Sequence, residues 1–252
     1  MSALAVLDAE RIKLATTRSS VWISLVVAVL SLALAALQGV LSHASAPLDP
    51  QRAALGIAVF GVPVLMVLAS MTVTSEYRSG MIRTTFIAVP NRTVVLLTKL
   101  VVVSVFSAAF AAALTVTAIA LAGVLAAAGG AVELSPASAG VWRLAAAIAL
   151  YAALATALGV GVGALVRAGP GAVAVLLLWP LVVEPMLGNL PEVGPQVGPY
   201  LPFANVFIFI DVPWLYPVYA MPWGPLGSLA YFVAVLAAVL GAAIAAVNVR
   251  DA

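Results

Sequence analysis

Cysteine is absent from this 252-residue sequence, and histidine occurs once, as His43. The lack of thiols excludes disulfide bonds, thiolate nucleophiles and cysteine-ligated metals. A single histidine cannot form a histidine-rich metal site. His43 lies just beyond the first long apolar run, and we expect it to be a loop residue in contact with water. We therefore expect no metal site and no cofactor in this chain.

Charged residues are also scarce: they make up 8% of the sequence, whereas hydrophobic residues make up 65% and the mean hydropathy is +1.21. A soluble domain carries about 25% charged residues, because it needs them to wet its surface. Alternation of apolar and polar residues at period two, the signature of a membrane β-barrel, is missing. A net charge of +2 without a basic patch does not indicate a nucleic-acid partner. The composition predicts an all-α integral membrane protein embedded in a lipid bilayer.

Long stretches without charge set the number of membrane spans. About 20 apolar residues cross a bilayer as a helix. We expect six spans, near residues 21–41, 54–74, 97–125, 144–166, 171–187 and 226–248. The first run exceeds the apolar core of a signal peptide, so we interpret it as a retained span, although Ala44-Ser45-Ala46 resembles a cleavage site. Residues 1–252 are predicted to form one membrane domain.

The basic residues predict the orientation of these spans, because cytoplasmic loops carry an excess of lysine and arginine. With the N-terminus inside, nine of the eleven basic residues face the cytoplasm. These are Arg11, Lys13, Arg18, Arg78, Arg83, Arg92, Lys99, Arg167 and Arg250. Only Arg52 and Arg143 then lie outside. We expect both termini to be cytoplasmic.

Residues 4–18 precede the first span, and we expect them to form a helix at the inner membrane surface. Asp8 and Arg11, like Glu10 and Lys13, are three residues apart and can form ion pairs on a helix. The basic residues interrupt its apolar stripe. A solvated tail ahead of the first span is therefore the alternative.

Residues 75–86 join the second and third spans and hold the densest charge in the sequence. We expect a short helix parallel to the membrane, ended before Pro90 because a proline pushes the preceding residue out of the α region. Tyr77, Met81 and Phe86 would face the membrane or the core, and Glu76, Arg78 and Arg83 would face water or a partner. Gly80 can stop a helix or permit close backbone approach. An ordinary positively charged inner loop explains the same residues.

Two features of the later spans are further candidates. Gly159 and Gly163 form a G-x-x-x-G face, which permits close helix packing within one chain or between two. Glu184 lies near the outer end of the fifth span, where an acidic group is costly and therefore a candidate for function, here as part of an outer gate. Its alternative is a side chain that reaches to the outer interface.

The outer segment, residues 188–224, is rich in prolines and aromatic side chains. Prolines prevent one long helix, and the segment is too apolar for a wet loop. We expect short, broken or re-entrant helices in the outer leaflet. Backbone at that depth must be buried in protein or line a wet cavity.

Several common catalytic patterns are missing. Neither of the two lysines follows a glycine, so the sequence has no G-x-x-x-x-G-K-S/T phosphate loop. The G-x-S-x-G and H-E-x-x-H motifs are also absent. We find no ionisable residue deep in a span, which argues against a proton-coupled carrier. We expect no enzyme activity in this chain by itself.

The run from Thr74 to Lys99, TSEYRSGMIRTTFIAVPNRTVVLLTK, resembles the permease subunits of type-2 bacterial ABC exporters. The weaker matching pieces are Glu10 to Leu14, Gly163 to Arg167, Trp179 to Pro185, and Arg250-Asp251. Threonine commonly follows the glycine in that family, whereas Met81 stands here. The layout of the whole chain agrees with the resemblance.

The resemblance implies a six-span permease of the bacterial cytoplasmic membrane that pairs with a second copy or a related permease. A separate ABC ATPase subunit would bind ATP and Mg²⁺. The surface to which this ATPase docks would be formed by the N-terminal helix, with Glu10, Arg11 and Lys13, and by the helix over residues 75–86, which we call the coupling helix. The coupling helix residues would be Glu76, Tyr77, Arg78, Gly80 and Arg83. Short outer helices would cap the pathway.

Two other classes of function stay open at this stage. A non-transporting membrane protein, such as a sensor, an immunity factor or an assembly subunit, would have no ATPase that drives transport. A channel or secondary carrier would pass ions without ATP. The sequence leaves the cargo open as well: drug, lipid, peptide and glycolipid are all compatible with an apolar pathway.

Overall fold

The computed structural model describes residues 3–42, 48–126, 134–135, 138–212, 216–217 and 219–249. His43, the Ala44-Ser45-Ala46 site, and Arg250-Asp251 lie outside these residues. Every regular element in the described part of the chain is helical, as the composition predicts.

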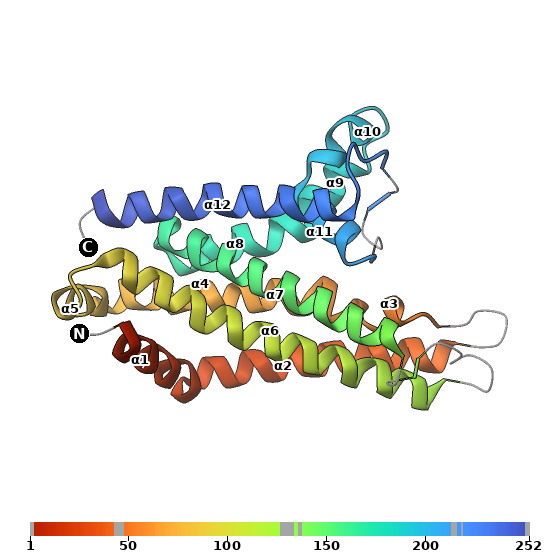
Figure 1. Cartoon of the computed structure of the whole chain (residues 1–252), viewed down its shortest axis with the longest axis horizontal. Helices are drawn as coiled ribbons and strands as arrows, with labels where there is room; N and C mark the ends of the chain where they lie inside the picture. Colours follow the sequence, from red (N-terminus) through yellow and green to blue (C-terminus); the bar gives the residue numbers. More distant parts are fainter. Residues whose placement is uncertain are drawn as a thin grey trace.

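Six helical segments in the described residues are long and apolar enough to cross a membrane (Figure 1). Three of them are single helices in the first two thirds of the chain: α2 (Arg18–Leu41), α6 (Arg92–Leu125) and α7 (Ala139–Val166). Another joins a π-helical segment, η1 (Gly56–Gly61), to α4 (Val62–Ser79). The fifth joins α8 (Gly169–Leu178), the π-helical η2 (Trp179–Val183) and α9 (Glu184–Gly188), and the sixth is α12 (Pro225–Val249).

The predicted number and order of spans are thus confirmed, and several of the helices extend beyond the spans predicted for them. The second helical segment continues to Ser79 rather than 74, the third begins at Arg92 rather than 97, and the fourth begins at Ala139 rather than 144. Charged and polar residues at these ends continue the helices instead of terminating them. Such residues extend a helix into the interface, where they can contact water while the backbone stays hydrogen-bonded.

The spans differ in how much of them is covered by protein. Within their most apolar stretch, 72% of the residues in Gly56–Ser79 and 61% of those in Ala139–Val166 are buried. For α2 and α12 the share is 22%. The helices α4 and α7 therefore form the centre of the bundle, and α2 and α12 present apolar faces to their surroundings.

The short elements lie at the two ends of this bundle (Figure 1). At one end are α1 (Ala3–Thr16) and α5 (Met81–Ala88), near both chain termini; we call it the α1/α5 end. At the opposite end are α3 (Pro50–Ala53), α10 (Gly194–Val197), the 3-10 helix η3 (Gly198–Tyr200) and α11 (Pro202–Phe209). The predicted broken helices of the outer segment are therefore present.

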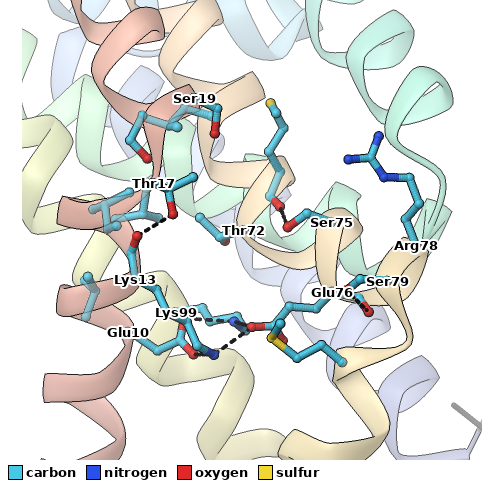
Figure 2. A pocket seen from close by; sticks show the side chains of 17 residues that line it. Glu10, Lys13, Thr17, Ser19, Thr72, Ser75, Glu76, Arg78, Ser79 and Lys99 are labelled. Carbon is cyan, nitrogen blue, oxygen red and sulfur yellow. Dashed lines mark hydrogen bonds and ion pairs between the residues drawn. The ribbon is translucent and has the colours of Figure 1, made fainter.

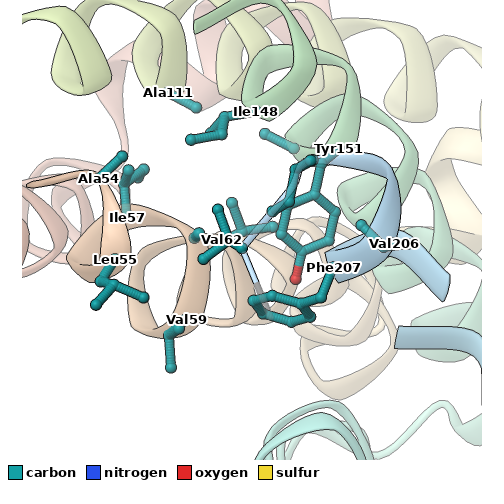
Figure 3. Close-up of a cluster of buried hydrophobic side chains, with 14 of the residues drawn as sticks. Ala54, Leu55, Ile57, Val59, Val62, Ala111, Ile148, Tyr151, Val206 and Phe207 are labelled. Carbon is teal, nitrogen blue, oxygen red and sulfur yellow. The ribbon is translucent and has the colours of Figure 1, made fainter. Parts of the chain in front are cut away.

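The outer segment is anchored in the core. Phe207 of α11 is 2% exposed and packs against Tyr151 of α7, with ring centroids 6.1 Å apart (Figure 3). Phe203 packs edge-to-face on Phe232 of α12 at 5.6 Å. Aromatic pairs at such separations contribute beyond the area that they bury. α11 thus lies inside the protein, which satisfies the requirement that broken helices at membrane depth be covered.

The glycine face of α7 packs within the chain. A Cβ atom added to Gly163 would lie 2.9 Å from the backbone oxygen of Ser70 on α4, and one added to Gly159 would collide with the backbone of Met66. The two central helices can therefore approach this closely only where one of them has no side chain.

This contact predicts that Gly163→Ala destabilises the protein while Gly241→Ala does not. The extra methyl at Gly163 pushes α4 and α7 apart, and overpacking of this kind costs about 1–3 kcal/mol. Gly241 on α12 has nothing within 4 Å of an added Cβ and serves as the matched control. Thermal unfolding of the two variants in the same detergent is the measurement. Equal unfolding temperatures would contradict the packing assignment.

Candidate functional site

Four charged side chains from three helices meet inside the protein near the α1/α5 end (Figure 2). α1 supplies Glu10 and Lys13, α4 supplies Glu76 and α6 supplies Lys99. Lys99 Nζ lies 2.8 Å from Glu10 Oε2 and 2.7 Å from Glu76 Oε1. Lys13 Nζ lies 2.9 Å from Glu10 Oε1 and 2.8 Å from Glu76 Oε1. Each charge thus has two opposite neighbours, and we call these four residues the ion-pair ring.

The ring is largely removed from water. The side chain of Lys99 is 2% exposed, those of Glu10 and Glu76 are 7% exposed, and only Lys13 is half-exposed. Charges buried in this way cost several kcal/mol each unless opposite charges compensate them. The ring contains two carboxylates and two ammonium groups, so its formal charge is zero. That balance makes the burial possible.

The environment of Lys13 favours its charged form. Burial lowers the pKa of Lys13, but hydrogen bonds to Glu76 and Glu10 and their negative charges outweigh this effect and raise the pKa above the ordinary lysine value. Lys13 therefore stays protonated at physiological pH.

The ring fixes α1 to the bundle. Glu10 and Lys99 are 89 residues apart, and Glu76 and Lys99 are 23 residues apart. A small apolar cluster supports the same contact: Val6 of α1 packs with Val95 of α6 and with Val89. α1 is thus a packed helix rather than a solvated tail. The predicted Glu10–Lys13 pair forms, and the Asp8–Arg11 pair, at 3.7 Å, is exposed.

The predicted single helix over residues 75–86 is wrong in one respect. α4 continues through Glu76 to Ser79, Gly80 adopts the left-handed conformation with φ of 72°, and α5 begins at Met81. An added Cβ at Gly80 would meet no atom within 4 Å. The backbone conformation alone, rather than close packing, therefore favours glycine here. Two helices joined by a left-handed residue replace the one that we expected.

This break also separates the predicted docking residues. We expected Glu76 to face water or a partner, but it is buried in the ring, where Lys13 of α1 and Lys99 of α6 hold it. Arg78 and Arg83 are exposed. On α5, Met81 is 50% and Ile87 is 81% exposed. The exposed surface at the α1/α5 end therefore combines guanidinium groups with uncovered apolar side chains.

Two arginines tie this end to α12, and the sequence interpretation treated them only as inner-side charges. Arg167 donates to the carbonyl oxygen of Ala246 at 3.2 Å and lies over the ring of Tyr77 at 4.8 Å. Arg92 donates to the carbonyl oxygen of Val247 at 2.9 Å. Cations at the C-terminal end of a helix satisfy its unpaired carbonyls and its dipole. Tyr77 thus contacts Arg167 at the end of α7, and its role in docking stays a prediction.

Glu184 is fully buried, so the exposed alternative is wrong. Its Oε2 accepts hydrogen bonds from the backbone N–H groups of Phe203 at 2.9 Å and Ala204 at 3.1 Å, at the start of α11. Its Oε1 accepts from Trp179 Nε1 at 2.8 Å. A carboxylate at the positive end of a helix stabilises that helix. Glu184 therefore positions α11, and its role in a gate stays a prediction.

A cavity of about 590 Å³ adjoins the ion-pair ring between α1, α2, α4 and α6 (Figure 2). All four ring residues line it, together with polar and apolar side chains. In the described residues no group of three or more acidic or histidine side chains could hold a metal ion. The site is thus a charged joint between helices beside a cavity.

A protein-family model described as "ABC-2 family transporter protein" matches residues 6–177. The matched stretch runs from α1 into α8, so it contains the whole ion-pair ring, Gly80, α5 and the glycine face of α7. No curated protein matches the sequence.

The ring predicts that Lys99→Met strongly destabilises the protein. The substitution leaves two buried carboxylates with one ammonium group, and breaking a buried pair costs about 3–5 kcal/mol. Arg11→Met is the control, because the Asp8–Arg11 pair is exposed and exposed pairs contribute little. Thermal unfolding in detergent measures both.

Adding Glu10→Gln to Lys99→Met should recover part of the lost stability, because it restores the charge balance without restoring the lysine. A Lys99→Met protein as stable as the Arg11→Met control would contradict the ring's structural role. Failure of the double variant to recover any stability would show that packing, and not charge balance, is what Lys99 supplies.

Proposed function

The chain belongs to the ABC-2 transporter family, and we propose that it is the membrane-spanning permease subunit of an ATP-driven exporter in the bacterial cytoplasmic membrane. The observation that carries this proposal is the ion-pair ring. It joins the peripheral helix α1 to two membrane spans one turn before the exposed helix α5. Such a contact can transmit a displacement of α1 or α5 to the membrane spans.

The charge distribution supports a cytoplasmic α1/α5 end. The described basic residues at that end are Arg11, Lys13, Arg18, Arg78, Arg83, Arg92, Lys99 and Arg167, and those at the opposite end are Arg52 and Arg143. Positive charge is retained on the cytoplasmic side of a membrane. The end of the bundle that contains the short helices α10 and α11 is then on the outer side of the membrane, where we place the exit of the pathway.

We assign ATP and Mg²⁺ to a separate ATPase subunit, because the sequence lacks a phosphate loop. Its docking surface would be α5, the last turn of α4 and the exposed face of α1. Arg11, Arg78 and Arg83 supply positive charge there, and Met81 and Ile87 supply apolar contact area. Interfaces of this kind combine an apolar centre with a charged rim.

Motion would then reach the membrane by two routes. A displacement of α5 is transmitted through Gly80 directly to α4. A displacement of α1 is transmitted from Glu10 to Lys99 on α6, and from Lys13 to Glu76 on α4. Both routes meet in α4, the most deeply buried span. This contact of α1 with the spans resists separation, because moving α1 away would break the Lys99–Glu10 and Lys13–Glu76 ion pairs.

We place the transport pathway between two permease chains rather than inside one. The central helices α4 and α7 are in backbone contact at Gly159 and Gly163 and leave no room between them at that level. The apolar faces of the peripheral spans offer surface for a second copy or a related permease. Type-2 exporters pair their permeases in this way, which agrees with the family.

Gentle purification from the native membrane tests the proposal. We expect a stoichiometric ATP-hydrolysing subunit to accompany the chain. Arg83→Glu should weaken that association by about tenfold, since it reverses a charge on the docking surface. The matched charge reversal Arg143→Glu, at the opposite end, should leave it unchanged.

Membrane insertion and thermal stability of both variants must equal those of the unmodified protein for the comparison to hold. Undiminished ATPase association of Arg83→Glu would exclude α5 as the docking surface. A preparation that repeatedly contains no ATPase subunit would contradict the exporter role.

A further inference from the structure

A second cavity, of about 500 Å³, lies at the end of the bundle opposite the α1/α5 end, and we call it the outer cavity. Its polar lining residues come from three separate segments: Gln51 from α3, Arg143 from α7, and Asp211 from just beyond α11. α7 runs from this end toward the α1/α5 end (Figure 1). The lining residues that follow Arg143 along α7 are Leu144, Ala146, Ala147 and Leu150. The α7 wall therefore changes once, from a charged rim to an apolar surface that continues into the span.

Arg143 is a cation without a counterion in the described part of the chain. Its side chain is exposed, and no carboxylate lies within ion-pair distance of it. Its place is also unusual for a basic residue, because basic residues collect on the cytoplasmic side of a membrane. Guanidinium groups are the protein groups best suited to bind a phosphate through two parallel hydrogen bonds. Arg143 is therefore available to an anionic group at the rim of the outer cavity.

Asp211 carries an anion to a place where the local structure disfavours it. Its φ of 58° is left-handed, and the N–H groups of Asp211 and Val212 close the end of α11 on the carbonyl oxygens of Ile208 and Phe207. Glycine is usual at this position, and a negative charge is unfavourable at the C-terminal end of a helix. Among the described residues its carboxylate has no ion-pair partner, and it accepts a hydrogen bond at 3.1 Å from the neutral amide of Gln51. A carboxylate kept at such a cost indicates a ligand.

The rim thus presents one cation and one anion that do not pair with each other, above an apolar wall. A ligand that satisfies both must carry a negative and a positive group of its own, together with an apolar chain. Arg143, Ala146, Ala147 and Leu150 are three, four and seven residues apart and share one face of α7. This face extends the site about 10 Å into the span, at 1.5 Å per residue.

We propose that the outer cavity binds the head group of one phosphatidylethanolamine molecule. Its ammonium group would pair with Asp211, its phosphate with Arg143, and an acyl chain would continue along α7 past Ala147 to Leu150. These partners follow the order of groups in the lipid, from the amine through the phosphate to the chain. An anionic lipid without an amine would leave Asp211 unpaired beside its own negative charge. The volume is within the usual range for a small-molecule site.

The lipid site goes beyond the exporter role. It lies at the opposite end of the bundle from the ATPase-docking surface, so the loss of one should not remove the other. The two proposals are therefore tested separately.

Native mass spectrometry of the full chain released from nanodiscs tests the site. The nanodiscs contain equal parts of phosphatidylethanolamine and phosphatidylglycerol. We expect one lipid to be retained, with phosphatidylethanolamine enriched by about tenfold. Retention of both lipids in equal amounts would overturn the proposal, and so would a preference for phosphatidylglycerol or a chain that retains no lipid.

Asp211→Asn tests the recognition of the amine. Asparagine tolerates the left-handed conformation, so the end of α11 should be kept while the negative charge is lost. The preference for phosphatidylethanolamine should then fall by about tenfold, because Arg143 alone attracts both lipids. Glu192→Gln removes an exposed acidic group at the same end, outside the cavity lining, and should leave the preference unchanged. An unchanged preference in Asp211→Asn would contradict recognition of the amine.

Arg143→Gln tests the recognition of the phosphate. It should reduce the retention of both lipids by about tenfold, whereas Arg52→Gln, an exposed position on α3 outside the cavity lining, should retain them. Equal retention in Arg143→Gln and Arg52→Gln would show that the lipid binds elsewhere on the surface. Thermal unfolding in the same detergent confirms that each variant is folded.

Discussion

The fold at the α1/α5 end depends on one constraint: charges buried beside a membrane must be balanced. Lys99 is inside the bundle, where it is 3% exposed and needs opposite charges close by. Glu76 and Glu10 supply the compensation, and Lys13 restores neutrality. Because the two carboxylates come from different helices, the charge balance is also a mechanical link. α1 cannot leave the bundle without breaking the Lys99–Glu10 and Lys13–Glu76 ion pairs.

The opposite end applies the same rule to a different group. Glu184 is buried, and its carboxylate is satisfied by Trp179 and by the first backbone N–H groups of α11. That arrangement holds a proline-broken segment within the bundle, where its backbone must be covered. Polar groups therefore organise both ends, and close backbone packing at Gly163 organises the middle. We propose that this division lets force enter at one end while the helices between move as connected bodies.

The sequence predicted the six spans and their order, because apolar length and charge spacing are local properties that the bilayer thickness selects. It also predicted the Glu10–Lys13 pair, which depends only on helical spacing. The burial of Glu76 and the importance of Lys99 were missed, since Lys99 pairs with Glu76, 23 positions away, and with Glu10, 89 positions away. One signal was available: Lys99 interrupts an otherwise apolar run, which in a span indicates a buried partner. The break at Gly80 was ambiguous, because a glycine can stop a helix or serve a close contact.

The most direct test of the central claim is the distance between α1 and α5 in the working complex, measured by electron spin resonance between two spin labels. The chain has no native cysteine, so Ala9→Cys and Thr84→Cys provide two exposed labelling sites at residues that carry none of the docking contacts named above. If the ion-pair ring makes α1 move as one unit with the end of α4 and with α5, the distribution of label-to-label distances will have a single narrow peak. It will be the same with and without ATP, and Lys99→Met will broaden it. A distance that shifts with ATP in the otherwise unmodified chain would show that α1 moves separately, and would contradict the account.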